Sequence, residues 1–153
     1  MERFAVTIDD ALRSVAFLFL DTAPVIYFVE KNPAYVDRVK DIFGRIDNGV
    51  PTGVTSPVTL AEALVHPIRR NLTAQQQDFI DVIVAGHNVR FLPIDYADGI
   101  RAAELRAKYN LSLTDALQIS SALSASCEAF LTNDFRLKKV TEIPILVLDE
   151  LTT

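Results

Sequence analysis

Short apolar runs alternate along the chain with longer segments in which apolar residues recur every three or four positions. The run AFLFL at residues 16–20 is continuously apolar, which is typical of a parallel strand covered by helices on both faces. Further strands are predicted at 54–56, 89–92, 129–131 and 145–148. Helical spacing predicts helices at 23–28, 35–46, 58–65, 73–86, 95–108 and 113–126. This alternation predicts an α/β fold, a three-layer α/β/α sandwich around a mostly parallel five-stranded sheet.

Local capping signals mark where several of these helices begin. Ser56 precedes Pro57, a residue type favoured in the first helical turn, and Asp95 can cap the helix that follows it. Thr73 and Gln76 have the spacing of a capping box, so we expect the side chain of Thr73 to cap the fourth helix.

The chain is predicted to form one domain over residues 16–153, because no segment rich in Pro, Gly and Ser divides it. Residues 1–15 form an N-terminal extension. Within the extension, Val6, Ile8 and Leu12 are spaced as in a short amphipathic helix, which we expect to pack on the domain.

The composition limits the chemistry that the chain can carry. Half of the residues are hydrophobic, but no apolar run approaches the roughly 20 residues that span a bilayer, and we expect a soluble, cytoplasmic protein. The single cysteine, Cys127, excludes an intrachain disulfide and a multi-cysteine zinc site, and two histidines offer little for histidine-based chemistry. The net charge of −5 argues against broad, nonspecific binding of nucleic acid but is compatible with a local basic rim around an acidic centre.

Two acidic residues are predicted to follow buried strands. Asp21 comes directly after the first predicted strand, and Asp134 comes shortly after the fourth. Thr132 and Asn133 lie beside Asp134. In open parallel sheets, ligands bind beyond the carboxyl ends of the strands. The two acids will therefore converge at one edge of the sheet if their strands are neighbours.

Two further acids lie on apolar helices. Glu62 is in PVTLAEALV, and Asp115 is in LSLTDALQIS. Residues three and four positions away on a helix share a face, and for both acids these neighbours resemble residues that face a core. We therefore expect both carboxylates to be partly buried, which requires a compensating partner or a metal ion.

Four carboxylates brought together would repel one another and take up protons unless a cation lay between them. Oxygen ligands favour Mg²⁺ or Mn²⁺, whereas the imidazole and thiolate ligands that favour zinc are scarce in this chain. Such a cation lowers the pKa of bound water and so supplies a nucleophile without a histidine base. The pattern predicts a metal-dependent hydrolase of phosphodiester bonds, with Asp21 as a metal ligand.

Each acid taken alone has a simpler interpretation. Asp21 has the position of a helix cap or loop residue, and Glu62 has that of an exposed acid at the rim of a helix. Asp115 can be a first-turn acid favoured by the helix dipole, and Asp134 can be a turn residue. Their joint occurrence favours the metal site.

Four segments in order, LDTAPVIY, TLAEAL, LTDALQIS and FLTND, resemble motifs of the PIN domain family, in particular its VapC-type toxin branch. The similarity covers nearly everything from residue 16 to residue 148. It implies a Mg²⁺- or Mn²⁺-dependent endoribonuclease whose catalytic residues are also the metal ligands: Asp21, Glu62, Asp115 and Asp134. It also implies that Thr132 orients a ligand or a water molecule, and that Thr22 and Asn133 support the ligands from behind.

The resemblance also implies partners. Toxins of this branch belong to type II toxin–antitoxin pairs, in which the tail of a small antitoxin covers the active site, and family members commonly form homodimers. The chain departs from the pattern in two places. About 15 residues precede the first strand, and Ala23–Pro24 stands where an Asn or Ser followed by an apolar residue is usual. Neither departure affects a carboxylate.

An acidic protein that binds RNA needs a local concentration of basic side chains. Two clusters follow the predicted acids, and they contain the candidate RNA-binding residues Arg69, Arg70, Arg136, Lys138 and Lys139. A third group consists of Arg101, Arg106 and Lys108. Each group is also compatible with a solvated charged face. Tyr27 and Phe135 are candidates for stacking on bases, with core packing as the alternative.

Three other functions fit parts of the pattern. A phosphoacceptor domain also places an Asp at a strand end, but LDTA lacks a second acid two residues later, and no well-placed lysine follows a later strand. A non-catalytic PIN-like interaction module would be expected to lose acids, whereas all four are present. A PIN-like RNA-processing nuclease without an antitoxin would have the same residues as the toxin.

Overall fold

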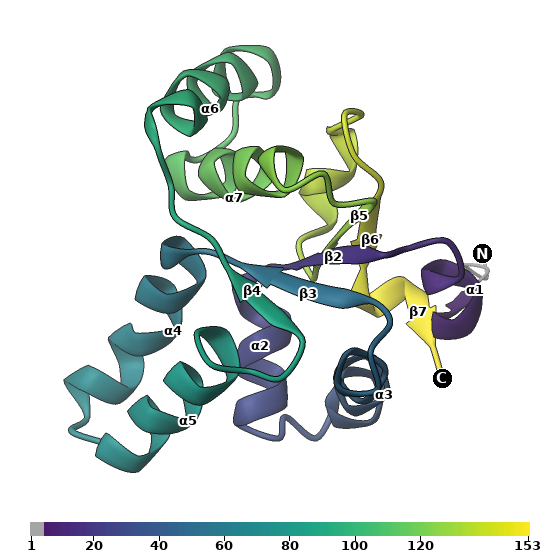
Figure 1. Ribbon diagram of the computed structural model, residues 1–153, viewed down its shortest axis with the longest axis vertical. Coiled ribbons are helices and arrows are strands. Elements are labelled where there is room, and N and C mark those ends of the chain that lie inside the picture. Colours follow the sequence, from purple (N-terminus) through teal and green to yellow (C-terminus); the bar gives the residue numbers. More distant parts are fainter. Residues whose placement is uncertain (1–4) are drawn as a thin grey trace.

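The computed structural model of the chain describes residues 5–153. Its centre is a five-stranded sheet with the strand order β4-β3-β2-β5-β6 (Figure 1). Every neighbouring pair of strands in this sheet is parallel. The strands are β2 (Phe17–Leu20), β3 (Thr52–Thr55), β4 (Val89–Phe91), β5 (Ala129–Thr132) and β6 (Ile145–Val147). The predicted parallel sheet is confirmed.

Strand β2 lies at the centre of the sheet and is buried on both of its faces. Phe19 stacks on Phe130 of β5 on one face, with ring centroids 5.2 Å apart. Leu18 and Leu20 belong to the hydrophobic cluster on the other face. Because side chains alternate between the faces of a strand, burial on both sides requires the continuously apolar sequence found here.

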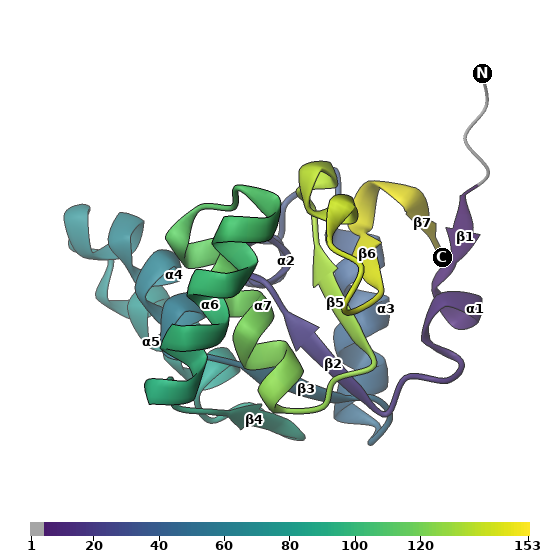
Figure 2. The same cartoon turned by 90° about the horizontal axis from the view of Figure 1, so that it is seen from above.

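Helices cover both faces of the sheet (Figure 2). The cluster around Leu18 and Leu20 is completed by α2 (Thr22–Val29), α3 (Val36–Asp47), α4 (Pro57–Arg69) and α5 (Thr73–Ile83). The opposite face, with Phe19 and Phe130, is covered by α6 (Tyr96–Tyr109) and α7 (Leu113–Ser124). The chain therefore has the predicted three-layer α/β/α architecture.

Capping interactions begin two of these helices where the sequence predicts. Ser56 Oγ accepts a hydrogen bond from the backbone N–H of Val58 at 3.1 Å, and Pro57 is the first residue of α4. At the start of α6, Asp95 and Asp98 each accept a hydrogen bond from the other's backbone N–H. These contacts satisfy N–H groups that have no partner within the helix.

The expected capping box at Thr73 and Gln76 is wrong. Thr73 is the first residue of α5, no side-chain cap precedes it, and Gln76 Nε2 donates to the backbone carbonyl of Pro67 at 3.1 Å. The Pro67 carbonyl lies in the last turn of α4, which continues to Arg69 instead of ending near residue 65 as expected, and carbonyls of a last turn have no partner within the helix. Pro67 is buried within the helix, where its packing offsets the hydrogen bond that proline cannot donate.

The two ends of the described chain lie side by side. Strand β1 (Val6–Thr7) pairs in parallel with β7 (Leu151–Thr152), and α1 (Ile8–Leu12) follows β1 directly. Arg45 of α3 bonds Asp9 of α1 at 3.0 Å. The sequence does not predict this second sheet, because a two-residue strand is too short to show a hydrophobic period.

Two short 3-10 helices complete the C-terminal part: η1 (Phe135–Lys139) after β5 and η2 (Leu148–Glu150) after β6. Within the described residues, no helix combines the length and the apolar composition needed to cross a lipid bilayer. The division of the chain into an extension and a domain at residue 16 stays a prediction, and residues 1–4 of the extension lie outside the described residues.

Candidate metal centre

Asp21 occupies the end of the central strand and is 9% exposed. Its Oδ1 accepts a hydrogen bond from the backbone N–H of Thr22 at 2.9 Å, so the residue caps α2, as the simpler interpretation of its position predicts. Its Oδ2 accepts a hydrogen bond from the hydroxyl of Thr132 at 2.8 Å. A cap needs the first of these bonds, whereas the second ties Asp21 to another strand.

The neighbouring strand β5 ends at Thr132, and Asp134 lies two residues later in the chain. Because β2 and β5 are adjacent and parallel, their carboxyl ends meet at one edge of the sheet, which is the arrangement that convergence of the two acids requires. The buried Thr132 hydroxyl donates to Asp21 and also accepts from the backbone N–H of Asp134 at 3.1 Å. One hydroxyl thus connects the two strand-end acids.

The carboxylate of Asp134 is already paired with a cation. Arg136 binds it through two contacts, Nε to Oδ1 at 3.0 Å and Nη2 to Oδ2 at 2.9 Å. This guanidinium holds the pKa of Asp134 below its ordinary value. The Arg136 side chain is 84% exposed, and ion pairs as exposed as this one contribute little to stability.

The two helical acids approach the same edge from α4 and α7. Glu62 Oε1 accepts a hydrogen bond from the hydroxyl of Thr22 at 2.8 Å. Glu62 is exposed, so the expectation of partial burial is wrong for this residue, because it lies on the side of α4 where Val65 and His66 are exposed as well. Asp115 is partly buried in the first turn of α7, where its backbone N–H donates to Ser112 Oγ at 3.2 Å.

The charges of two of these acids affect the pKa of a third. Burial raises the pKa of Asp21 to about 6, against the opposing effect of the hydrogen bonds from Thr132 and Thr22. The negative charges of Asp115 and Glu62 raise this pKa further. Across residues 5–153, no three Asp, Glu, His or Cys side chains already lie close enough to enclose a metal ion. Asp21, Asp115 and Glu62 therefore influence one another through their charges, although they do not enclose a metal site.

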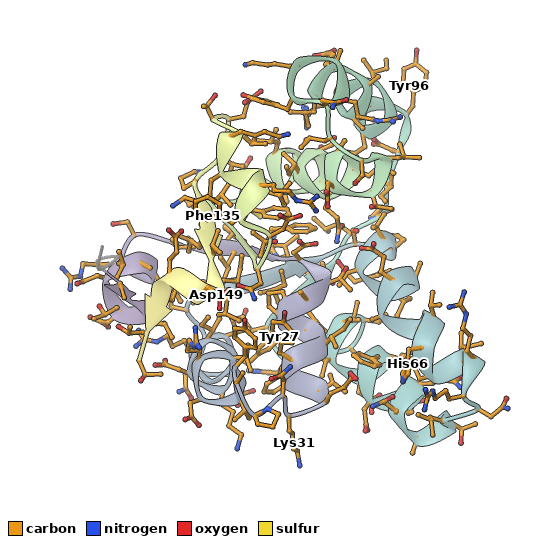
Figure 3. The ribbon with its side chains drawn as sticks, turned by 180° about the vertical axis from the view of Figure 1, so that it is seen from behind. Tyr27, Lys31, His66, Tyr96, Phe135 and Asp149 are labelled. Carbon is orange, nitrogen blue, oxygen red and sulfur yellow. The ribbon has the colours of Figure 1, made fainter. Side chains whose placement is uncertain are left out.

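The donor set fits a hard divalent cation. A buried carboxylate with two negative neighbours gains from a nearby positive charge, and the surrounding groups are carboxylate and hydroxyl oxygens, which suit Mg²⁺ or Mn²⁺. His66 lies out along α4, apart from Phe135 of η1 (Figure 3). Burial raises the pKa of Cys127 to about 12, which keeps this thiol protonated. Cys127 therefore offers no thiolate ligand to the centre.

Sequence reasoning missed a buried polar network beside the acids. Ser56, Thr59 and Gln118, here called the Gln118 network, are at most 1% exposed. Ser56 Oγ donates to Gln118 Oε1, and Gln118 Nε2 donates to Thr59 Oγ1 at 2.8 Å. The signal was present in the sequence, since Thr59 lies three residues before Glu62 and Gln118 three residues after Asp115. A polar residue on an otherwise apolar helix face predicts a partner, but not which one.

Asn133 forms its hydrogen bonds with groups other than the four predicted acids. Its Oδ1 accepts a hydrogen bond from the backbone N–H of Asp149 at 3.0 Å, and its Nδ2 donates to the hydroxyl of Tyr27 at 3.4 Å. Tyr27 also stacks on Tyr35, with centroids 4.3 Å apart, so the packing interpretation holds for this ring. Figure 3 shows Tyr27 near Asp149, below Phe135.

The basic residues differ in their distance from the acids. Arg136 binds Asp134, and the charge of Lys139 also lowers the pKa of Asp134. Lys138 pairs with Glu150 at 2.7 Å. Arg69 and Arg70 are exposed at the end of α4, with Arg69 about 10 Å beyond Glu62 along the helix axis.

The third basic group is engaged within the fold. Arg101 donates to the Ser120 carbonyl at 3.3 Å and to Ser124 Oγ at 2.7 Å. Arg106 donates to the carbonyl of Leu111 at 3.2 Å. These contacts join α6 to α7 and to the loop between them.

The fold of this chain is similar to the folds of several solved structures. A toxin–antitoxin complex from Klebsiella pneumoniae is 20% identical, covering 86% of this chain and 97% of the other, with a TM-score of 0.62. VapBC2 from Rickettsia felis, bound to a DNA fragment from the promoter, is 18% identical, covering 86% and 98%, with a TM-score of 0.66. VapC20 from Mycobacterium tuberculosis, a Sarcin-Ricin loop cleaving toxin, is 17% identical, covering 83% and 98%, with a TM-score of 0.65.

At these identities, the likeness to solved structures concerns the fold. No curated protein matches the chain significantly. The family model of the PIN domain matches residues 18–143, which include the central sheet from β2 to β5, both helical layers and all four predicted acids. The chain therefore belongs to the PIN domain family.

Proposed function

We propose that this PIN domain is a Mg²⁺- or Mn²⁺-dependent endoribonuclease that hydrolyses RNA phosphodiester bonds. The observation that carries the proposal is the environment of Asp21, a buried carboxyl group bonded to Thr132 and within the field of Asp115 and Glu62. Such a group is unfavourable at neutral pH without a nearby cation. Oxygen ligands alone favour Mg²⁺ or Mn²⁺ over zinc.

The ligands of the cation are proposed to be Asp21, Glu62, Asp115 and Asp134. When bound, the cation supplies charge stabilisation for a phosphate and activates water for attack. The chain itself holds the ligands in place. Thr132 donates to Asp21, and Thr22 donates to Glu62, so each hydroxyl limits the rotation of one carboxylate. Asn133 supports the site indirectly, because it connects the end of β5 to the segment around Asp149.

The phosphate backbone of the RNA is proposed to lie along η1. This turn carries Arg136, Lys138 and Lys139 directly after Asp134, and Arg136 already contacts one of the proposed ligands. Arg69 and Arg70 would extend the contact along α4. Phosphate contacts from a few basic residues reconcile RNA binding with the net charge of −5.

We further propose that the chain is the toxin of a type II toxin–antitoxin pair. The similar structures include toxin–antitoxin complexes and a toxin that cleaves the Sarcin-Ricin loop. The proposed partners are an RNA substrate, a small antitoxin and a second copy of the chain, in the cytoplasm. Co-purification with a small protein encoded beside its gene supports the toxin, whereas cleavage by a chain that purifies alone supports an RNA-processing nuclease.

The catalytic proposal is tested by incubating RNA with the purified chain and Mg²⁺ or Mn²⁺. We expect cleavage by the parent and a loss of at least about 100-fold in Asp21→Asn and Asp115→Asn, because each variant removes charge that the cation and the transition state require. Chelation of the metal should abolish cleavage by the parent.

Asp78→Asn is the matched control, because Asp78 is an exposed acid on α5 and its substitution removes the same charge. The control should cleave within about twofold of the parent. Equal cleavage by the parent, Asp21→Asn and Asp115→Asn would contradict the proposed mechanism and leave a non-catalytic PIN module as the better description.

A further inference from the structure

The Gln118 network spans three elements that meet beneath the acids. Gln118 of α7 donates to Thr59 of α4, and Thr59 Oγ1 donates to the backbone carbonyl of Leu20 at 3.4 Å. Gln118 Oε1 accepts a hydrogen bond from Ser56, the cap of α4. The chain of bonds thus runs from α7 through α4 to the last residue of β2.

The orientation of the Gln118 amide is determined by its partners. The hydroxyl of Thr59 has one hydrogen, which it gives to Leu20, so it can only accept from Gln118. The amide nitrogen must therefore face Thr59, and its oxygen must face Ser56. Because all three side chains are buried, breaking one bond leaves a polar group without water or partner, which is unfavourable. The network consequently restricts how α4 and α7 can shift relative to each other.

The residues that these hydrogen bonds connect lie one or three positions from a proposed metal ligand in the sequence. Leu20 precedes Asp21 in the chain. Thr59 is three residues from Glu62 on α4, and Gln118 is three residues from Asp115 on α7, so each pair shares a helix face. The hydrogen bonds from Gln118 through Thr59 to Leu20 therefore connect the segments that carry three of the four acids.

We propose that Gln118 is a positioning residue for the divalent cation site, acting through α4 and α7 to set the spacing of Glu62 and Asp115 about Asp21. This inference rests on the metal site of the proposed function. Residues behind metal ligands orient them, and their loss typically weakens metal binding about 10- to 100-fold. A residue that served packing alone could be replaced by an apolar side chain of similar length without that effect.

The test is the dissociation constant of Mn²⁺ for the parent chain and for Gln118→Met, measured by calorimetry and by the electron paramagnetic resonance of free Mn²⁺. Methionine keeps the length of glutamine but neither accepts from Ser56 nor donates to Thr59. We expect Mn²⁺ to bind about tenfold more weakly to this variant.

Ile119→Val is the matched control, because Ile119 is the next residue of α7, is fully buried and belongs to the hydrophobic cluster around Phe19. It should lower the melting temperature while leaving the Mn²⁺ dissociation constant within about twofold of the parent value. That result would show that destabilisation of the helix alone does not explain weaker Mn²⁺ binding by Gln118→Met.

Thr59→Val is a second variant of nearly unchanged shape, which keeps the test valid if Gln118→Met does not fold. The combined loss of Mn²⁺ affinity in the double variant should be smaller than the sum of the two single losses, because both substitutions break the bond between Gln118 and Thr59. Binding by both single variants within twofold of the parent would overturn the inference and leave the metal site intact. Failure of the parent to bind Mn²⁺ would instead overturn the metal site and the proposed function together.

Discussion

The negative charge of Asp134 can be compensated either by Arg136 or by a bound divalent cation. In the structure, Asp134 forms an ion pair with Arg136, which lies two residues later on η1. The negative charge of Asp115 also stabilises the charged form of Arg136. A divalent cation bound by Asp134 and Asp115 would take over that role. Because the Arg136 pair is exposed, it is weak enough to be displaced at modest cost.

For this pair of residues, we predict that Arg136→Gln binds Mn²⁺ more tightly than the parent. The loss of the competing guanidinium should lower the dissociation constant by about 1.5- to fivefold, the range that corresponds to the weak energies of exposed ion pairs. Calorimetric titration without RNA isolates this competition from any contact of Arg136 with substrate.

The matched control is Lys138→Gln, which removes the same charge from the same turn but disrupts a pair with Glu150. A purely general effect of net charge would tighten Mn²⁺ binding equally in both variants. That outcome, or unchanged binding by Arg136→Gln, would show that the guanidinium and the cation do not compete for Asp134.

Helices α6 and α7 form a hairpin that carries Asp115, and a buried acid joins its two helices. Asp98 of α6 is 3% exposed. Its Oδ1 accepts hydrogen bonds from Ser120 at 2.9 Å and from Ser124 at 2.7 Å. Burial alone would raise the pKa of Asp98, but the hydrogen bonds from Ser124, the Asp95 backbone and Ser120 outweigh it and lower this pKa below the usual 3.8.

For the hairpin we predict that Asp98→Asn lowers the free energy of unfolding by about 2 kcal/mol at pH 7, because hydrogen bonds to charged groups contribute roughly 1.5–3 kcal/mol. A lowered pKa means that the ionised carboxylate stabilises the folded state. This stabilisation is complete above the unfolded-state pKa and is lost as the pH falls through the folded-state pKa. Urea unfolding from pH 7 to pH 3 measures the difference.

Glu104→Gln is the control for the hairpin, because Glu104 is exposed on the same helix. Its effect should stay within about 0.5 kcal/mol at every pH. A parent-to-Asp98→Asn difference that does not shrink toward pH 3 would show that the charge of Asp98 is not the stabilising feature.

For the whole molecule, one edge of the sheet collects acids from segments that are far apart in the sequence. Asp21 and Asp134 follow adjacent strands, while Glu62 and Asp115, on α4 and α7, lie close enough for their charges to raise the pKa of Asp21. A cation bound there would connect β2, α4, α7 and the end of β5. Binding to the folded chain but not to the unfolded one stabilises the fold by linkage.

We therefore predict that millimolar Mg²⁺ raises the melting temperature of the parent by about 3–5 °C, the shift expected for a concentration roughly ten times the dissociation constant. The shift should be smaller in Asp21→Asn, which lacks the buried ligand. Differential scanning calorimetry at equal ionic strength, with NaCl as the control salt, separates specific binding from screening. An equal shift in both proteins would place the bound Mg²⁺ elsewhere.

The local pattern of the sequence is enough to predict most helices and strands and the order in which they occur. The apolar run before Asp21, the Ser56–Pro57 start of α4 and the Asp95 cap of α6 all depend on residues within a few positions of one another. Local signals were misleading where a distant group intervened. Gln76 has the spacing of a capping residue, but the end of α4 offers it a carbonyl instead.

By itself, the sequence determined the types of chemical group, namely four acids, two of them after strands and two on apolar helices, and the parallel α/β frame that carries them. Only the tertiary structure decided the partners: Thr132 for Asp21, Thr22 for Glu62, and Arg136 for Asp134. It also decided that Gln118 bridges two helices and that β1 pairs with β7. The reason is physical, since hydrophobic periodicity acts over a few residues, whereas a hydrogen bond depends on distances that exist only after the whole chain has packed.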